Sequence, residues 1–559
     1  MNSNILEHTW PRDVPENLTQ PSRTYKKNLI LAMAGLLLFI GIYIALTIWF
    51  CHTSYRLFDS AFNGSGGFLE GLVAVFNGIL AIFMIKSLFI SNKSDQSHNL
   101  EITDQDEPRL FAFLNELADK AGAPRPNKVY LSNMVNAMVF YDLKFWNLLF
   151  PSKKNLEIGL GLINVLNLGE FKAVLAHEFG HFAQRSMLLG RWVYIAHQIA
   201  VYIIAKRDAL DNILAVLSRI DIRIAWIGWI LSLIVWSIRS IIDMLFRVVI
   251  IAHRALSREM EFHADLVAVS LTGSDALIHA LHKLRAADQA LEDALATANA
   301  QLFDEKAVKD LYTLQSNAIE QTARILDNPQ YGRSPSLPET DRSKHRIFKS
   351  KIAQPPKMWA THPADNDRED NAKKTYVEAT INSESSWALF QNPKETRLKL
   401  TKMLLDTAEK KATSELSDDE ALSTQNKKFE KSFLDTKYRG LYLKQPITRH
   451  IKSPDELFQQ DPGLNLNDLK EQLVDVYPES LNNDLEELEE VSEELGLLMA
   501  LKENVLTAPG GVITHRGNQI KRRDLPKIIE KVEAENLEYD EEFANIGKEN
   551  IEPESNQKE

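Results

Sequence analysis

The chain has 559 residues, of which 45% are hydrophobic and 25% are charged, and its formal net charge is −12. Most of this charge lies near the end, because residues 481–559 hold 20 acidic and 9 basic residues. The rest of the chain is nearly neutral, so we expect no nucleic-acid partner. Cys51 is the only cysteine, which excludes an intramolecular disulfide and a zinc site built from several thiolates.

The chain begins with a polar arm, residues 1–28, and continues with two apolar stretches. Residues 28–50 carry no charge and, at about 1.5 Å per residue, are long enough to cross a hydrocarbon core of about 30 Å. Residues 68–90 carry only Glu70 and Lys86, which lie toward the ends, where their charges can reach the membrane interface. Both stretches are predicted to be transmembrane helices.

The two stretches make residues 29–91 a predicted hairpin of transmembrane helices. The N-terminal arm holds four basic residues, whereas the loop inside the hairpin holds one, Arg56. The positive-inside rule then predicts a cytoplasmic N-terminus. The segment that follows, residues 92–186, returns to the cytoplasmic side.

A His-Glu-Phe-Gly-His motif lies in the apolar-periodic segment 171–187, which we predict to be a helix. Positions i and i+4 share one face of a helix, so His177 and His181 can bind the same metal ion. Glu178 can then act as the base toward a water molecule at that metal. A glycine at position 180 costs the helix about 1 kcal/mol relative to alanine. Because this costly residue lies between the two candidate ligands, we predict tight packing there.

Two further apolar stretches, 187–205 and 224–251, are long enough to cross a membrane and form the predicted segment 187–252. The second stretch carries three charged residues on one helical face. They are Arg239, Asp243 and Arg247. This stripe indicates either an ion-paired interior face or a helix that leaves the membrane.

A catalytic zinc usually takes three protein ligands, and the best third candidate is Glu261. It lies in Ser-Arg-Glu-Met-Glu-Phe-His-Ala-Asp, residues 257–265, which also has a helical pattern. Glu261 and Asp265 are one turn apart on one face, so Glu261 can bind the metal while Asp265 accepts the free ring N–H of a ligating histidine. His253 is the alternative third ligand.

Metal ligands on both sides of segment 187–252 must meet on one side of the bilayer, so the chain between them crosses an even number of times. We favour two crossings there and four spans in total, with two spans and a membrane-lying hairpin as the alternative. Four basic residues oppose the four-span topology, which places them outside. They are Lys206, Arg207, Arg219 and Arg223.

The sequences HEFGH and SREMEFHAD together resemble the integral-membrane zinc metallopeptidases typified by the heat-shock protease HtpX and the CAAX prenyl endopeptidase. The pattern of that family is HExxH, followed by a glutamate ligand in a Ser-Arg-x-x-Glu-x-x-Ala-Asp context. The resemblance covers about residues 109–368. It implies one Zn²⁺ per chain, held by His177, His181 and Glu261.

Two weaker matches add residues to this implied site. Thr361-His362-Pro363 with Arg368 resembles a His-Pro segment near the active site, and implies that His362 or Arg368 helps to stabilise the oxyanion. Residues 135–139 resemble the edge strand that aligns the substrate. This second match implies that Asn136, Ala137 and Met138 bind the peptide main chain as an added strand.

The resemblance implies an α-helical multi-pass membrane protein with a mainly helical, α+β, zincin-like metalloprotease domain in two halves, residues 92–186 and 253–374. The expected location is a cell membrane, namely the bacterial inner membrane, with the catalytic domain in the cytoplasm. The expected partners are the lipid bilayer and a protein or peptide substrate, and the expected role is protein quality control. The alternatives are a CAAX-type processing peptidase and a non-catalytic scaffold with a structural zinc site. The base Glu178 argues against the scaffold.

The remainder, residues 375–559, is predicted to be an acidic, soluble and mostly helical C-terminal region. Its acidic run, residues 484–494, has the composition of a solvated helix face. Docking of a partner is the alternative interpretation of this run.

Overall fold

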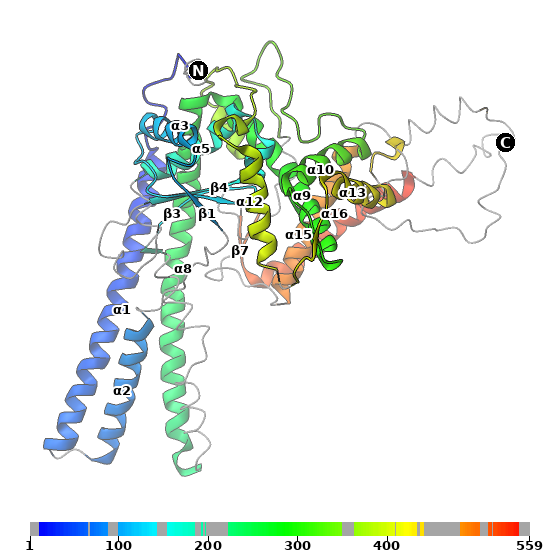
Figure 1. The fold of residues 1–559 in the computed structure, drawn as a ribbon. Coiled ribbons are helices and arrows are strands. Elements are labelled where there is room, and N and C mark those ends of the chain that lie inside the picture. The colour runs from blue at the N-terminus through cyan, green and yellow to red at the C-terminus, as the bar shows by residue number, and fades with distance from the viewer. Residues whose placement is uncertain are drawn as a thin grey trace, which may run out of the picture.

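The structure is a computed structural model and describes residues 10–64, 67–87, 99–141, 154–184, 192–193, 196, 222–348, 363–408, 410–432, 436–440, 465, 481–503, 513–516 and 518–546. These ranges form a bundle of long helices, a small sheet covered by helices, and further helices toward the C-terminus (Figure 1). The predicted membrane stretch 187–205 lies outside the described residues apart from three positions. His362 and residues 206–219 lie outside them entirely.

The long bundle begins with α1 (Arg23–Asn63) and α2 (Phe68–Ser87), which pack as an antiparallel hairpin (Figure 1). The Ser22 side chain caps the start of α1, and the helix continues past the predicted span because residues 51–63 contain neither proline nor glycine. The Tyr43 hydroxyl donates to the Met84 carbonyl at 2.7 Å and joins the two helices.

The third helix of the bundle, α8 (Ile222–Thr272), runs antiparallel to α1 over most of its length (Figure 1). Near its middle, Phe246 meets Phe39 of α1 with ring centroids 6.1 Å apart. Farther along, the Asn28 amide of α1 donates to the Ala255 carbonyl. The start of α8 therefore lies at the far end of the bundle and its last turns reach the sheet.

Large apolar side chains are exposed on the outside of this bundle. Those most exposed include Ile30, Leu37, Ile48 and Trp49 on α1, Val75 and Ile82 on α2, and Leu233, Trp236, Met244 and Val248 on α8. Among the residues that the structure describes, one helix, α1, is long and apolar enough to cross a membrane by length and composition. The predicted span 28–50 lies inside α1.

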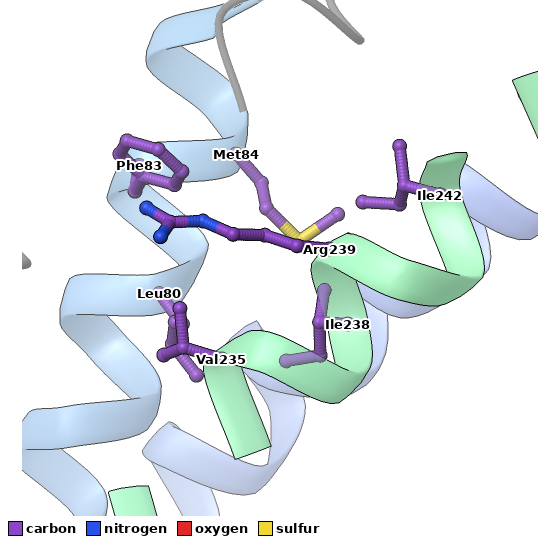
Figure 2. Close-up of a pocket in the computed structure, with 7 residues that line it drawn as sticks. All are labelled: Leu80, Phe83, Met84, Val235, Ile238, Arg239 and Ile242. Carbon is purple, nitrogen blue, oxygen red and sulfur yellow. The ribbon is translucent and has the colours of Figure 1, made fainter. Parts of the chain in front are cut away.

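The charged stripe of α8 lies within this apolar bundle. Arg239 extends into a small hollow between α2 and α8, and its guanidinium points toward Phe83 (Figure 2). The rest of the lining is aliphatic or thioether, and consists of Leu80, Met84, Val235, Ile238 and Ile242. One turn beyond, Arg247 and Asp243 form an ion pair at 2.8 Å on the same helix.

A four-stranded sheet lies near the start of α1 and the end of α8 (Figure 1). Its strands are β1 (Leu100–Ile102), β2 (Val129–Ser132), β3 (Ala137–Tyr141) and β4 (Lys154–Gly159), in the order β1-β2-β4-β3. β2 and β4 are parallel, and the other two pairs are antiparallel. β3 is therefore an edge strand.

Helices cover this sheet and close the main hydrophobic core. α3 (Pro108–Lys120), α4 (Leu160–Val165) and α5 (Leu168–Ala183) precede α8, while α9 (Ser274–Phe303), α10 (Leu311–Ile325) and α11 (Asp365–Lys373) follow it. The short strand β5 (Lys306–Ala307) lies between α9 and α10. Phe113 of α3 and Phe171 of α5 stack in this core with centroids 6.3 Å apart.

The main core includes residues from outside the two predicted peptidase halves. Leu18 of the N-terminal arm belongs to it, and so do Val377, Phe390 and Leu400, which follow the predicted peptidase halves. Leu400 lies in α12 (Pro393–Asp406). The helices that follow are α13 (Asp418–Ser432), α15 (Leu481–Lys502) and α16 (Leu525–Ile546), with β7 (Ile513–His515) and β8 (Asn518–Ile520) between the last two. The first part of the C-terminal region is therefore built into the core that supports the sheet.

Candidate metal centre

The HExxH motif lies in the second half of α5, and the first turn of this helix is fully capped. The Asn167 side chain accepts the Glu170 N–H at 2.9 Å, and the Glu170 carboxylate accepts the Asn167 N–H at 3.0 Å. This capping box starts the helix at Leu168, three residues before the predicted start. Both histidines then lie on one face, with ring centroids 4.8 Å apart.

Glu261 of α8 lies between these two imidazoles. His177 Nε2 lies 3.3 Å from Glu261 Oε2, and His181 Nε2 lies 3.4 Å from Glu261 Oε1. The two Nε2 atoms are 3.2 Å apart. His177 and Glu261 are buried, and His181 is partly buried. The structure therefore brings together three donor groups that lie up to 84 residues apart in the chain.

The spacing of these donors fits a tetrahedral metal ion. Metal–ligand bonds of about 2.05 Å in a tetrahedron place neighbouring donor atoms about 3.3 Å apart. The two Nε2 atoms, 3.2 Å apart, have this spacing, and one ligand atom from each of the three residues lies within 4.8 Å of the other two. Two imidazoles and one carboxylate are a set that catalytic zinc uses, with a fourth position for water. Within the described ranges, His253 does not belong to this cluster.

Asp265 and Arg368, which lie behind the three donors, orient His177. Asp265 Oδ1 lies 2.8 Å from His177 Nδ1, on the side of the ring away from Glu261. Arg368 of α11 pairs with the same aspartate through two hydrogen bonds, Nη2 to Oδ1 at 2.6 Å and Nε to Oδ2 at 3.0 Å. The Asp265 and Arg368 side chains are both almost completely buried. Asp265 therefore fixes the ring of His177, and Arg368 fixes Asp265.

These contacts shift two pKa values strongly. Burial lowers the pKa of His177, but its hydrogen bonds to Asp265 and Glu261 outweigh burial and raise it to about 9. Burial raises the pKa of Asp265, but the charge of Arg368 and the bond to His177 lower it to about 2. These contacts favour the protonated imidazole in metal-free protein, so a metal ion competes with a proton for His177.

The helix that carries the HExxH motif, α5, contacts α8 at Gly180, where the sequence predicted tight packing. A Cβ atom added to Gly180 would lie 2.9 Å from the Ala264 Cα and 3.2 Å from its Cβ. A side chain at position 180 would push α5 away from α8. Because α8 carries Glu261, such a displacement would separate the histidines from the carboxylate.

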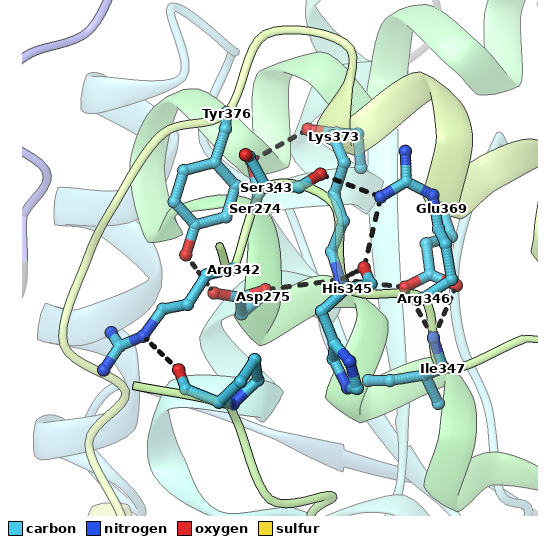
Figure 3. A network of polar contacts seen from close by, with 12 residues as sticks. Ser274, Asp275, Arg342, Ser343, His345, Arg346, Ile347, Glu369, Lys373 and Tyr376 are labelled. Carbon is cyan, nitrogen blue, oxygen red and sulfur yellow. Dashed lines mark hydrogen bonds and ion pairs between the residues drawn. The ribbon is translucent and has the colours of Figure 1, made fainter. Parts of the chain in front are cut away.

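A network of buried polar contacts holds α11, and with it Arg368, against α9 (Figure 3). The Glu369 carboxylate accepts the main-chain N–H groups of Ile347 and Phe348 and an ammonium bond from Lys373 at 2.9 Å. Lys373 also lies 3.6 Å from Asp275, at the start of α9. The position of Arg368 is therefore determined by groups outside the metal site.

The N-terminal arm adds contacts that sequence reasoning missed. His263 accepts the Gln184 amide N–H at Nδ1, and its Nε2 lies 2.8 Å from the Thr19 carbonyl. The arm also places the ring of Trp10 over the buried ammonium of Lys172 on α5, at 3.3 Å. These contacts link residues far apart in sequence, so no local pattern could have revealed them.

The remaining predicted site residues are distributed as follows. Glu178 lies in α5 and is buried, with 8% of its surface exposed. Asn136 precedes the edge strand β3, and its carbonyl accepts the Gly159 N–H at 2.7 Å. Ala137 is buried, whereas Met138 is 40% exposed. His362 lies outside the described residues, and an oxyanion role for His362 or Arg368 stays a prediction.

Comparison with known proteins agrees with this geometry. Residues 104–376 match the model of peptidase family M48. The chain is 26% identical over 258 residues to "Protease HtpX homolog" of Listeria monocytogenes serotype 4b (strain CLIP80459), covering 42% of this chain and 78% of that protein. It is 27% identical over 236 residues to "Protease HtpX" of Haemophilus influenzae (strain PittEE), covering 40% of this chain and 75% of that protein. No solved structure matches the chain. The donor cluster lies inside the matched range, so residues 104–376 are similar to the metallopeptidases of family M48 and carry a metal-binding donor set.

Proposed function

We propose that the chain is a membrane-embedded zinc endopeptidase that cleaves membrane or membrane-proximal proteins in protein quality control. The observation that carries this proposal is the convergence of His177, His181 and Glu261, with Glu178 next to the first ligand, at the end of an apolar helix bundle. A structural zinc site has no need of a carboxylate base at this position. The site therefore favours catalysis over a scaffold.

Zinc would be held by the Nε2 atoms of His177 and His181 and by the carboxylate of Glu261. When bound, it supplies Lewis-acid chemistry to the scissile carbonyl and makes a water molecule more acidic. Asp265 keeps His177 in the tautomer and orientation that present Nε2 to the ion. The Asp265–Arg368 pair holds this orientation before substrate arrives.

Glu178 is the general base and general acid of the proposed reaction. Its carboxylate takes a proton from the attacking water and later delivers this proton to the leaving amine. The edge strand β3 offers its outer main-chain groups to an extended peptide, which would add as one more strand. Main-chain pairing is tolerant of side-chain identity, so broad cleavage specificity follows.

The membrane part of the proposal rests on α1, α2 and α8. Soluble proteins rarely expose apolar surface as continuous as that of this bundle. α5 ends at Ala183 beside the sheet, whereas α8 begins at Ile222 at the far end of the bundle. The end of α5 and the start of α8 therefore lie at opposite ends of the bundle. This separation supports the four-span topology, and the cytoplasmic placement of the N-terminus and the peptidase domain rests on the positive-inside rule.

Removing a ligand tests the metal site. Wild-type protein should contain about one zinc per chain, and His177→Ala or Glu261→Ala should lose most of it, because two donors hold the ion weakly. Glu259→Gln is the matched control, since Glu259 lies on the same helix but outside the cluster. Metal analysis after dialysis measures the result. Full zinc retention in Glu261→Ala would remove Glu261 from the site.

The topology can be tested with single cysteines, because Cys51→Ser makes the chain cysteine-free. In intact cells, a membrane-impermeant maleimide should label a cysteine at Asn63 and one at Asp211, but not one at Asp104. Asn63 reports the far end of the hairpin and Asp104 the peptidase side. If the cysteine at position 211 stays unlabelled while that at 63 reacts, the chain has two spans with a membrane-lying hairpin.

A further inference from the structure

A segment that follows residue 376, where the family match ends, crosses the start of α5. Residues 377–390, here called the strap, follow α11 and end just before α12. The Leu168 N–H donates to the Glu384 carbonyl at 2.7 Å, and the Gly169 N–H donates to the Asn382 carbonyl at 2.9 Å. Two main-chain oxygens of the strap thus bind the first turn of α5.

These two bonds complete the hydrogen bonding of the helix start. The first N–H groups of an α-helix have no partner within the helix, and a buried one that stays unpaired is costly. In α5 the next two, of Glu170 and Phe171, are taken by the side chain and the carbonyl of Asn167. Leu168 and Gly169 are both buried, so the strap and not water is the partner of these N–H groups. The strap is therefore the partner that allows α5 to begin inside the core.

The strap is itself fixed on both sides of this contact. Before it, the Val377 N–H donates to the Ser274 hydroxyl at 3.1 Å, at the start of α9. After it, the Ser386 hydroxyl donates to the Leu166 carbonyl at 2.8 Å. Leu389 and Phe390 then insert into the main hydrophobic core. The strap is thus a fixed part of the peptidase core.

Gly169 leaves room for this approach. A Cβ atom at position 169 would lie 2.7 Å from the Asn382 nitrogen and 2.7 Å from Ile381 Cγ2. The first of these is a main-chain atom, so the clash could be relieved only if the strap or the helix moved. The closeness of the two chains depends on the absence of a side chain at Gly169.

We infer that the strap is a positioning part of the metal site, which extends the functional core to residue 390. The inference rests on the proposed metal-binding function. The α5 helix is held near its end by the contact of Gly180 with Ala264 and at its start by the strap. Without the strap, the start of α5 would lose two main-chain bonds and would be held there only by side-chain contacts such as those of Phe171 and Lys172, so that it could pivot about the Gly180 contact. The pivot would carry His177 away from Glu261. Because coupling is reciprocal, bound zinc must also stabilise the strap.

The test uses full-length protein in detergent with Gly169→Ala and the matched control Gly496→Ala. Both replace glycine by alanine in a helix, but a Cβ at Gly496 of α15 meets no atom within 4 Å. In chelator competition, Gly169→Ala should bind zinc at least about tenfold more weakly than wild type, as expected for a change behind the ligands. Gly496→Ala should bind zinc like wild type. Hydrogen exchange on wild-type protein is the second measurement, in case Gly169→Ala fails to fold. Zinc should slow amide exchange in residues 377–390 but not in α15.

The outcomes separate this inference from the proposed function. If wild-type protein binds zinc through His177 and Glu261 but Gly169→Ala binds it equally well, the strap does not position the site. Wild-type exchange in residues 377–390 that is unchanged by zinc would also overturn the inference. If wild-type protein binds no zinc, the proposed function itself fails.

Discussion

Glu178→Gln is expected to keep zinc and fold but to lose most peptidase activity, by about 10²- to 10⁴-fold. Glutamine has nearly the same shape as glutamate but cannot accept the proton of the attacking water. Glu178 is not among the three converging donors, so its replacement leaves the metal ligands intact. Cleavage of an unfolded membrane-protein substrate, measured together with zinc content, checks both parts of the result.

The comparison with Glu261→Ala makes this result specific. Both variants should be inactive, but only Glu261→Ala should lose zinc. An inactive Glu178→Gln without zinc would show that Glu178 supports the site rather than the reaction. Undiminished proteolysis by Glu178→Gln would reject the proposed mechanism.

Helical spacing was sufficient to predict which donors share a helix face, although it left His253 open as the alternative third ligand. His177 and His181 lie four residues apart, and Glu261 and Asp265 repeat this spacing on a second helix, so each pair shares a face whatever the rest of the fold does. The true start of α5 also had a local signal, because Asn167 and Glu170 form an Asn-x-x-Glu capping pattern. The prediction missed it because it followed only the apolar periodicity.

The supports of the cluster could not be predicted in the same way. The strap binds α5 through main-chain carbonyls, which every residue carries, so its side chains give no sign of this contact. Arg368 meets Asp265 across 103 residues, and only the fold brings them together. The helices α1 and α8 are longer than their apolar stretches because hydropathy marks where lipid is tolerated, not where a helix ends.

Arg368→Gln is expected to destabilise the protein by about 3–5 kcal/mol, because it leaves the Asp265 carboxylate buried without its charged partner. The pKa of Asp265 should rise, since the charge of Arg368 is the largest effect that lowers it. A less reliably charged Asp265 holds His177 less firmly, so zinc affinity should fall by about 10- to 100-fold. Chemical denaturation and chelator competition on full-length protein measure the two effects. Arg368→Lys should recover little, because an ammonium cannot replace the two-bond contact with Asp265.

Arg346→Gln is the matched control for this prediction. Arg346 pairs with Asp370 of α11 at 2.8 Å, but their side chains are 36% and 67% exposed. Solvent screens such a pair, so its loss should change stability by less than about 1 kcal/mol and leave zinc affinity unchanged. If Arg368→Gln instead lowers kcat while stability and zinc affinity match Arg346→Gln, Arg368 acts on the oxyanion, and its contact with Asp265 does not position the metal ligand.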